Sequence, residues 1–212
     1  MYDLIGGGFA RYSVDESWTI PHFEKMLYDN AQLVRIYLDG WRLTKEMRFR
    51  QVVEETLEWA RRELSHPDGA FYAAQDADSE GEEGRFFVWD PAEIQAVLGQ
   101  ELGEAFCRAY GVTDSGNFGG KTVLNRLGDA GSSAEAQEQF DATLRPARKK
   151  LLSAREQRVK PQRDENILTS WNALAVSAFL DAYQTFGTPW YLSSAEQALT
   201  FLIDYAIADG RV

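Results

Sequence analysis

Two stretches of the sequence resemble each other and decide the fold. Residues 30–62 read NAQLVRIYLDGWRLTKEMRFRQVVEETLEWARR, and residues 172–204 read NALAVSAFLDAYQTFGTPWYLSSAEQALTFLID. Aligned without gaps at an offset of 142, they share seven identical residues in 33, beginning with Asn30 and Asn172. Each stretch reads as two amphipathic helices, because apolar residues recur every three to four positions. Any two amphipathic hairpins have some likeness, so chance similarity is the alternative to a true repeat.

A repeated helical hairpin has a consequence for the fold. One hairpin cannot bury its own apolar face, so it must stack on neighbours, and stacking in a closed ring gives an α/α toroid. We therefore predict a mainly α fold. The expected helices cover residues 22–44, 47–64, 91–98, 101–109, 134–158, 169–186 and 189–207, and a hairpin of two short strands covers 70–74 and 85–89. We expect residues 1–212 to form one domain that is a fragment of a larger ring, because both ends resemble cuts through it.

The amino-acid composition disfavours several classes of protein. The 212 residues carry 33 acidic and 22 basic side chains, a net charge of −11, which disfavours nucleic acid and anionic membranes as partners. No apolar run reaches the roughly 20 residues of a transmembrane helix, and no signal peptide is visible at the N-terminus. Cys107 is the only cysteine, so an internal disulfide is excluded. These features predict a cytoplasmic protein.

The first polar cluster lies where the first hairpin begins. His22, Glu24, Lys25, Tyr28 and Asp29 gather at the predicted start of the helix, where free N–H groups and the helix dipole favour anions. Alternatively, these side chains have no ligand and serve only to cap the N-terminus of the helix and to form an ion pair. The preceding glycines, residues 6–8, do not form a dinucleotide fingerprint, because an arginine occupies the place of its third glycine.

The second cluster is the acidic loop 75–84, QDADSEGEEG. Its five carboxylates repel one another, which can raise the pKa of one of them toward general-acid use. The same carboxylates could instead bind a hard cation. In the simplest alternative, the loop is a solvent-exposed acidic turn without a functional role. An EF-hand is disfavoured, because position 12 of that pattern is Phe87 and the loop is flanked by predicted strands.

Two further motifs remain. Residues 116–122, GNFGGKT, end like a phosphate loop, but Ser115 stands where its first glycine belongs and no apolar strand precedes it. A nucleotide phosphate site is therefore disfavoured. The other motif, RDEN at residues 163–166, enters the second hairpin, and the offset of 142 puts Asp164 opposite His22 and Asn166 opposite Glu24. Equivalent loops of a toroid share a rim, so these clusters are expected to converge on one site.

Four strings together resemble the YyaL / spermatogenesis-associated protein 20 family: GGGFARYSVDESWTIPHFEKMLYDNAQL, AFYAAQDADSEGEEGRFFVW, GNFGGKTVLN and RDENILTSWNAL. The resemblance implies a thioredoxin-like domain followed by a partial (α/α)6 toroid, similar to six-hairpin glycosidases and N-acylglucosamine 2-epimerases. This chain matches the middle of the toroid, and the thioredoxin-like domain is absent from it. Asn166 stands where the family usually has Lys, and Ala173 where it usually has Gly.

We therefore expect a carbohydrate-active domain, a sugar epimerase or a glycoside hydrolase, that needs no cofactor and takes a small-molecule sugar. For hydrolysis, Asp76 or Asp78 would be the general acid and Asp164 or Glu24 its partner, with a separation of about 5 Å for retention and about 6.5–9.5 Å for inversion. For epimerisation, His22 would be a base. The expected substrate-binding residues are Arg11, Tyr12, Tyr28, Asp29, Gln75, Arg163, Trp171 and Asn172.

Two alternatives stay open. One is a non-catalytic toroid that binds a protein or sugar and works beside the thioredoxin-like domain of the full-length family. The other is a divalent-cation site in the loop at residues 76–83, although the catalytic prediction itself includes no metal.

Overall fold

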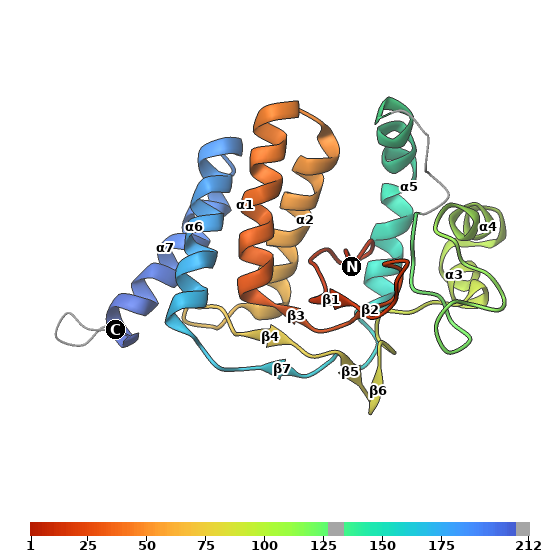
Figure 1. The fold of residues 1–212 in the computed structure, drawn as a ribbon, viewed down its shortest axis with the longest axis horizontal. Coiled ribbons are helices and arrows are strands. Elements are labelled where there is room, and N and C mark those ends of the chain that lie inside the picture. The colour runs from red at the N-terminus through yellow and green to blue at the C-terminus, as the bar shows by residue number, and fades with distance from the viewer. Residues whose placement is uncertain (127–133, 207–212) are drawn as a thin grey trace. The chain divides into compact units, whose positions relative to one another are not determined.

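The computed structural model describes residues 1–126 and 134–206 (Figure 1). The chain divides into two compact units, each assembled from separated segments. Unit 1 comprises Met1–Gly6, Ala10–Phe23 and Ala77–Pro161, and unit 2 comprises Gly7–Phe9, Glu24–Asp76 and Gln162–Val212. The expectation of one domain stays a prediction.

Unit 2 is built from two helical hairpins. Helices α1 (Leu27–Thr44) and α2 (Met47–Leu64) form the first, and α6 (Thr169–Phe186) and α7 (Pro189–Phe201) form the second. A π-helical segment, η2 (Leu202–Ala206), continues α7. Helix α1 packs against both α2 and α6, and Figure 1 shows the three side by side. The prediction of a mainly α fold is confirmed, and the bounds expected for α2 and α6 are those observed.

The repeat is confirmed by the geometry of the two hairpins. Helices α1 and α6 are both 18 residues long, and both α1 to α6 and α2 to α7 begin at the predicted offset of 142. The residue that ends the first helix is left-handed in both hairpins, Lys45 at φ 61° and Gly187 at φ 70°. The likeness therefore extends to the backbone of the turn, beyond what amphipathic patterning alone requires.

This left-handed turn gives a prediction about stability. Lys45 has a β-carbon in a conformation that only glycine adopts freely, so Lys45→Gly should raise the free energy of unfolding by about 0.5–1 kcal/mol. Gly187→Ala should lower it by about 1 kcal/mol. Urea denaturation measures both effects. The control is Lys45→Ala, which removes the charge but keeps the β-carbon; a gain as large as that of glycine would refute the explanation.

A buried asparagine ties each hairpin to an incoming loop. Asn30 accepts the N–H of Phe9 (2.7 Å) and donates to the carbonyl oxygens of Phe9 (3.1 Å) and Met26 (2.8 Å). Asn172 makes the same three bonds, with the N–H of Phe71 (2.8 Å) and the carbonyl oxygens of Phe71 (2.9 Å) and Leu168 (3.1 Å). We call these two residues the asparagine clamps; each closes the entry of its hairpin.

A glycine lies two residues before each clamped phenylalanine. A β-carbon on Gly7 would come within 2.2 Å of the Glu55 carbonyl oxygen, and one on Gly69 within 2.7 Å of the Gln197 β-carbon. Glu55 and Gln197 are themselves 142 residues apart, in α2 and α7. The glycines at residues 6–8 therefore let a loop approach a helix closely. This packing requirement accounts for them, and no nucleotide-binding role is needed.

Three short strands, each of two residues, form a sheet in unit 2 in the order β3 (Lys25–Met26), β4 (Ala74–Gln75) and β7 (Arg163–Asp164). This sheet corrects two expectations. The first helix begins at residue 27, later than the expected 22, because the preceding residues are extended and pair with other strands. A short β-hairpin is present as predicted, but it pairs residues 78–79 with 82–83. Its expected placement at 70–74 and 85–89 was wrong, because β4 pairs with β3 and β7.

The described residues of unit 1 form three helices and two small hairpins. The helices are α3 (Pro91–Leu98), α4 (Gln100–Ala109) and α5 (Ala134–Arg155); the hairpins pair β1 (Tyr12–Ser13) with β2 (Pro21–His22), and β5 (Asp78–Ser79) with β6 (Glu82–Glu83). Helix α5 ends three residues before the expected 158. The predicted start of α3 is confirmed: Asp90 is the N-cap, Pro91 is the first helical residue, and Asp90 and Glu93 form a reciprocal capping box.

The core of unit 1 is formed by large apolar side chains from α3, α4 and α5. The side chains of Ile94, Phe106, Tyr110 and Leu151 are each at most 1% exposed.

None of the described helices is both long and apolar enough to cross a bilayer.

Candidate functional site

The sheet of unit 2 gathers three of the predicted carboxylates on one face. Met26, Ala74 and Asp164 are cross-strand neighbours, so their side chains share a face. Glu24 lies two residues before Met26 and Asp76 two residues after Ala74, and residues two apart in an extended chain point the same way. Glu24, Asp76 and Asp164 therefore project from one side of the sheet. We call them the carboxylate face.

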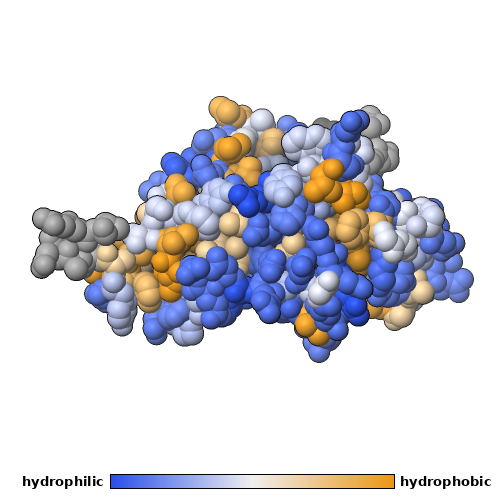
Figure 2. Space-filling model, turned by 60° about the horizontal axis from the view of Figure 1, so that its bottom comes forward, coloured by the Kyte–Doolittle hydropathy of each residue, from blue (hydrophilic) through white to orange (hydrophobic). Residues whose placement is uncertain are grey.

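The three carboxylates of this face differ in exposure. Asp76 and Asp164 are exposed and Glu24 is half-buried. The N–H of Asp76 donates to the Gln162 carbonyl (2.8 Å), which extends the pairing of β4 with β7 by one residue. Asp164 accepts from both the backbone N–H (3.1 Å) and the side-chain amide (2.7 Å) of Asn166, which hold its carboxylate in place. Figure 2, which brings the lower side of Figure 1 forward, shows a largely hydrophilic surface.

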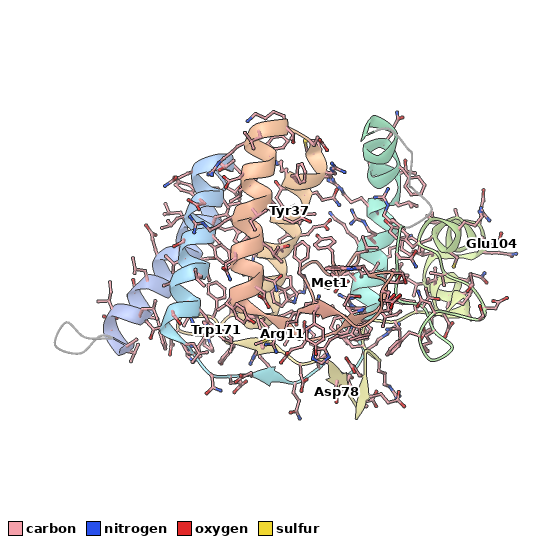
Figure 3. All side chains as sticks on the ribbon, in the orientation of Figure 1. Met1, Arg11, Tyr37, Asp78, Glu104 and Trp171 are labelled. Carbon is pink, nitrogen blue, oxygen red and sulfur yellow. The ribbon has the colours of Figure 1, made fainter. Side chains whose placement is uncertain are left out.

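An aromatic pair belongs to the same unit. The rings of Tyr28, in the first turn of α1, and Trp171, in the first turn of α6, lie 4.6 Å apart at 55°. Both side chains are half-buried. Trp171, labelled in Figure 3, lies at the end of α6 that adjoins the strands. Asp29 is half-buried beside Tyr28 in the first turn of α1. Each helix therefore contributes an aromatic ring next to the sheet.

The opposite face of the sheet holds the structure together. Lys25, Gln75 and Arg163 are cross-strand neighbours on it. Lys25 is 2% exposed and donates to the Gly7 carbonyl (2.8 Å), while Gln75, 4% exposed, accepts from the indole N–H of Trp59 (3.1 Å).

Arg163 completes this face. Its guanidinium lies 4.0 Å from the ring centre of Tyr72 and donates to the Glu63 carbonyl (3.3 Å). Of the predicted substrate-binding residues, Gln75, Arg163 and the clamp Asn172 thus have structural partners inside the unit.

Unit 1 holds a histidine–carboxylate pair. His22 Nδ1 lies 2.7 Å from Glu83 Oε1, and the histidine ring stacks on Tyr12 at 5.0 Å between ring centres and 22° between planes. Their backbones place them: Tyr12 pairs with His22 across β1 and β2, and Glu83 pairs with the exposed Asp78 across β5 and β6. A carboxylate on Nδ1 fixes the tautomer and orients the ring, leaving Nε2 as the nitrogen that exchanges protons.

The turn that returns the chain from β1 to β2 is held by one carboxylate. Asp15 accepts from the Ser17 hydroxyl (2.5 Å) and from the N–H groups of Ile20 (2.7 Å) and Thr19 (2.9 Å). These bonds, that of Ser17 first, lower the pKa of Asp15 to about 2. Asp15 therefore stays ionised at neutral pH and fixes the hairpin that carries His22. Arg11, also labelled in Figure 3, is exposed just before this hairpin.

Three of the five carboxylates in the acidic loop contact basic side chains. Arg85 contacts both Glu80 (3.0 Å) and Glu82 (3.2 Å), and Glu83 contacts the histidine. Within residues 1–126 and 134–206, no cluster of three or more His, Cys, Asp or Glu is arranged to hold a metal ion. The geometry thus lends no support to the cation alternative.

The predicted site residues divide between the two units. Unit 2 contains Glu24, Tyr28, Asp29, Gln75, Asp76, Arg163, Asp164, Trp171 and Asn172, and unit 1 contains Arg11, Tyr12, His22 and Asp78. The sequence interpretation missed Glu83 as a partner of His22, because within the acidic loop it reads only as one charge among five. The signal that could have found it is the Glu80–Gly81 pair, which forms a tight turn and puts Glu83 on a strand opposite Asp78.

Comparison with known sequences confirms the resemblance. The chain is 34% identical to rat and 33% identical to human spermatogenesis-associated protein 20, over 94% and 99% of its length. It is also 36% identical over its whole length to a Caenorhabditis elegans protein described as uncharacterized. No protein-family model matches the chain. The chain is thus homologous to spermatogenesis-associated protein 20, and it spans about a third of the length of these relatives.

Among solved structures, a D-mannose isomerase aligns with 93% of this chain and 46% of its own, at 13% identity and a TM-score of 0.33. A cellobiose 2-epimerase from Spirochaeta thermophila aligns with 95% of this chain and 46% of its own, at 19% identity and a TM-score of 0.26. Similarity at this level bears on neither ring closure nor activity, so the closed (α/α)6 toroid stays a prediction.

Proposed function

We propose that this chain is part of a carbohydrate-active domain, of the sugar epimerase or glycoside hydrolase type, and that its carboxylate face binds a neutral sugar. The observation that carries the proposal is the placement of Glu24, Asp76 and Asp164 on one side of a sheet in the unit that also presents the Tyr28–Trp171 pair. Carboxylates accept hydrogen bonds from sugar hydroxyls, and aromatic rings stack on the apolar faces of pyranose rings.

Two reactions suit these residues. In a hydrolase, Asp76 would protonate the leaving oxygen while Asp164 or Glu24 acts as nucleophile or activates water. In an epimerase, a proton leaves a carbon next to a carbonyl group and returns to the other face, which requires a base that works near neutral pH. The candidate for this role is His22, whose Nδ1 is held by Glu83 within unit 1.

Calorimetric titration of the chain with a panel of neutral mono- and disaccharides tests the proposal. We expect one class of sugar to bind, and Asp76→Asn and Asp164→Asn each to weaken binding about tenfold or more, because each removes a charged acceptor. Asp39→Asn is the matched control: Asp39 is an exposed carboxylate of the same unit that pairs with Arg42 on α1. Unchanged binding in both test variants, or an equal loss in Asp39→Asn, would refute the assignment.

The same binding experiment, combined with an activity assay, distinguishes the non-catalytic alternative from an enzyme. If sugars bind but none is turned over by the full-length relatives, the carboxylate face serves recognition alone. If no sugar binds, a protein partner becomes the better hypothesis, alongside the thioredoxin-like domain that the resemblance implies for the whole protein.

A further inference from the structure

Helix α6 packs against α1 through one flank, and its contacts define that flank. Near the end of α6, the Asp181 carboxylate accepts a hydrogen bond from Arg35 (2.8 Å) and the Thr185 hydroxyl accepts one from Arg42 (2.8 Å). Earlier in the helix, two alanines that are at most 2% exposed border a small cavity between α1, α2 and α6. The covered flank of α6 thus consists of residues three or four positions apart, namely Ala175, Ala178, Asp181 and Thr185.

The repeat offset of 142 identifies the same flank on α1. It consists of Leu33, Ile36, Asp39 and Leu43, which we call the exposed flank. Ile36 is 63% exposed, whereas its counterpart Ala178 is fully buried. Leu43 is 86% exposed, the highest value among the large apolar side chains of the described residues. The same flank is therefore covered by a neighbouring helix in the second hairpin and exposed to solvent in the first.

The residues of the exposed flank form the pattern of a helix–helix contact. Ile36 and Leu43 are seven positions apart, which is two helical turns, so they share a face. Asp39 lies between them, is 68% exposed and pairs with Arg42 of its own helix (3.0 Å). Its counterpart Asp181 pairs with an arginine of the neighbouring helix. Single exposed apolar residues are common on protein surfaces, but two on one face that is covered in the equivalent helix indicate a docking surface.

The contact between α1 and α6 also specifies the partner that fits this surface. Helix α1 meets the covered flank of α6 with two basic side chains, Arg35 and Arg42. A helix in the same relation to α1 would present a basic side chain to Asp39 and apolar side chains to Ile36 and Leu43. Such a partner is an amphipathic helix, the element from which both hairpins of unit 2 are built.

We propose that a further helical hairpin of the same protein docks on the exposed flank of α1, as α1 docks on α6. It would continue an interface that is already present in unit 2, and stacking on neighbours is how repeated hairpins bury their apolar faces. The chain spans about a third of the length of its relatives, so the full-length relatives contain further residues that can supply such a hairpin. The proposal requires neither sugar binding nor a closed ring.

Cysteine labelling tests the proposal. Ile36→Cys is introduced into this chain, where the native Cys107 is buried, and the aligned residue is replaced by cysteine in full-length rat spermatogenesis-associated protein 20. We expect the new thiol to react with iodoacetamide about tenfold or more slowly in the full-length protein, because the docked hairpin covers it. Glu58→Cys is the matched control, because Glu58 is exposed on α2 and lies outside this flank. Its rate should agree within about twofold between the two proteins.

Leu43→Cys keeps the test decisive if Ile36→Cys fails to fold, since an 86% exposed side chain contributes little to the core. Equal rates in the two proteins would overturn the proposal. So would protection in this chain alone that grows with its concentration, which would identify a second copy as the occupant, and so would equal slowing at Glu58.

A photo-reactive amino acid at the position of Leu43 in the full-length protein identifies the segment that covers the flank. We expect cross-links to a helix of another hairpin. Cross-links to the thioredoxin-like domain that the resemblance implies would overturn the proposal, because the occupant would then be a different domain.

Discussion

Asn172→Ala should lower the free energy of unfolding of unit 2 by about 3–4 kcal/mol, a large effect for one polar side chain. The side chain is fully buried and makes three hydrogen bonds, two of them to the backbone of Phe71. Alanine leaves the Phe71 N–H and carbonyl oxygen without that partner in the interior, and each such group costs about 1–3 kcal/mol. Urea denaturation followed by circular dichroism measures the change.

Two comparisons make this prediction specific. Asn30→Ala should cost a similar amount, because Asn30 makes the equivalent three bonds in the first hairpin. Asn166→Ala should cost less than about 1 kcal/mol, because Asn166 is exposed and bonds only locally, to Asp164. A loss below 1 kcal/mol for Asn172→Ala would contradict the clamp. Unequal losses at Asn30 and Asn172 would contradict the equivalence of the hairpins.

His22→Gln should lower the rate of sugar proton exchange about 10²–10⁴-fold if the domain is an epimerase, because glutamine cannot exchange a proton near neutral pH. Glu83→Gln should lower it by a comparable factor, since Glu83 holds Nδ1 at 2.7 Å and so sets the tautomer. The measurement is exchange of the C2 proton of the substrate in deuterated water, followed by NMR with the full-length relative.

The neighbouring carboxylate supplies the control. Glu82 is also in β6 but pairs with Arg85, so Glu82→Gln should leave the exchange rate unchanged. The double variant of His22 and Glu83 should be no slower than His22→Gln alone, because residues that act as a unit are not additive. Additive losses would show that Glu83 acts separately from His22, and an unaffected rate in His22→Gln would remove the epimerase form of the proposal.

Helices were predictable where the chain carries its own stop signals. Helix α2 ends before His66-Pro67-Asp68-Gly69, and α3 begins at Asp90-Pro91, so side-chain chemistry fixes both bounds. The strands were not predictable in the same way. Each has only two residues, too few for an alternating pattern, and β7 reaches β4 from about 90 residues away. Their pairing is decided by the packing of the hairpins they connect.

The sequence identified individual residues of the candidate site, but it did not predict which other residues they contact. The offset of 142 put Asp164 opposite His22 and Asn166 opposite Glu24. The sheet brings Glu24 and Asp164 to the carboxylate face, whereas His22 belongs to unit 1. Sequence patterns treated Asn172 as a site residue, whereas its bonds to Phe71 depend on a loop 101 residues away.

The most direct test of the sugar-binding claim is the indole N–H resonance of Trp171 in a two-dimensional NMR titration with neutral sugars. Trp171 lies 4.6 Å from Tyr28 and belongs to the same unit as the carboxylate face, so a bound pyranose should shift its signal saturably. Trp171→Phe identifies the resonance among the six tryptophans. A saturable shift at Trp171 that is lost in Asp76→Asn is the predicted result. An unmoved Trp171 signal across the whole panel, or shifts confined to other tryptophans, would contradict it.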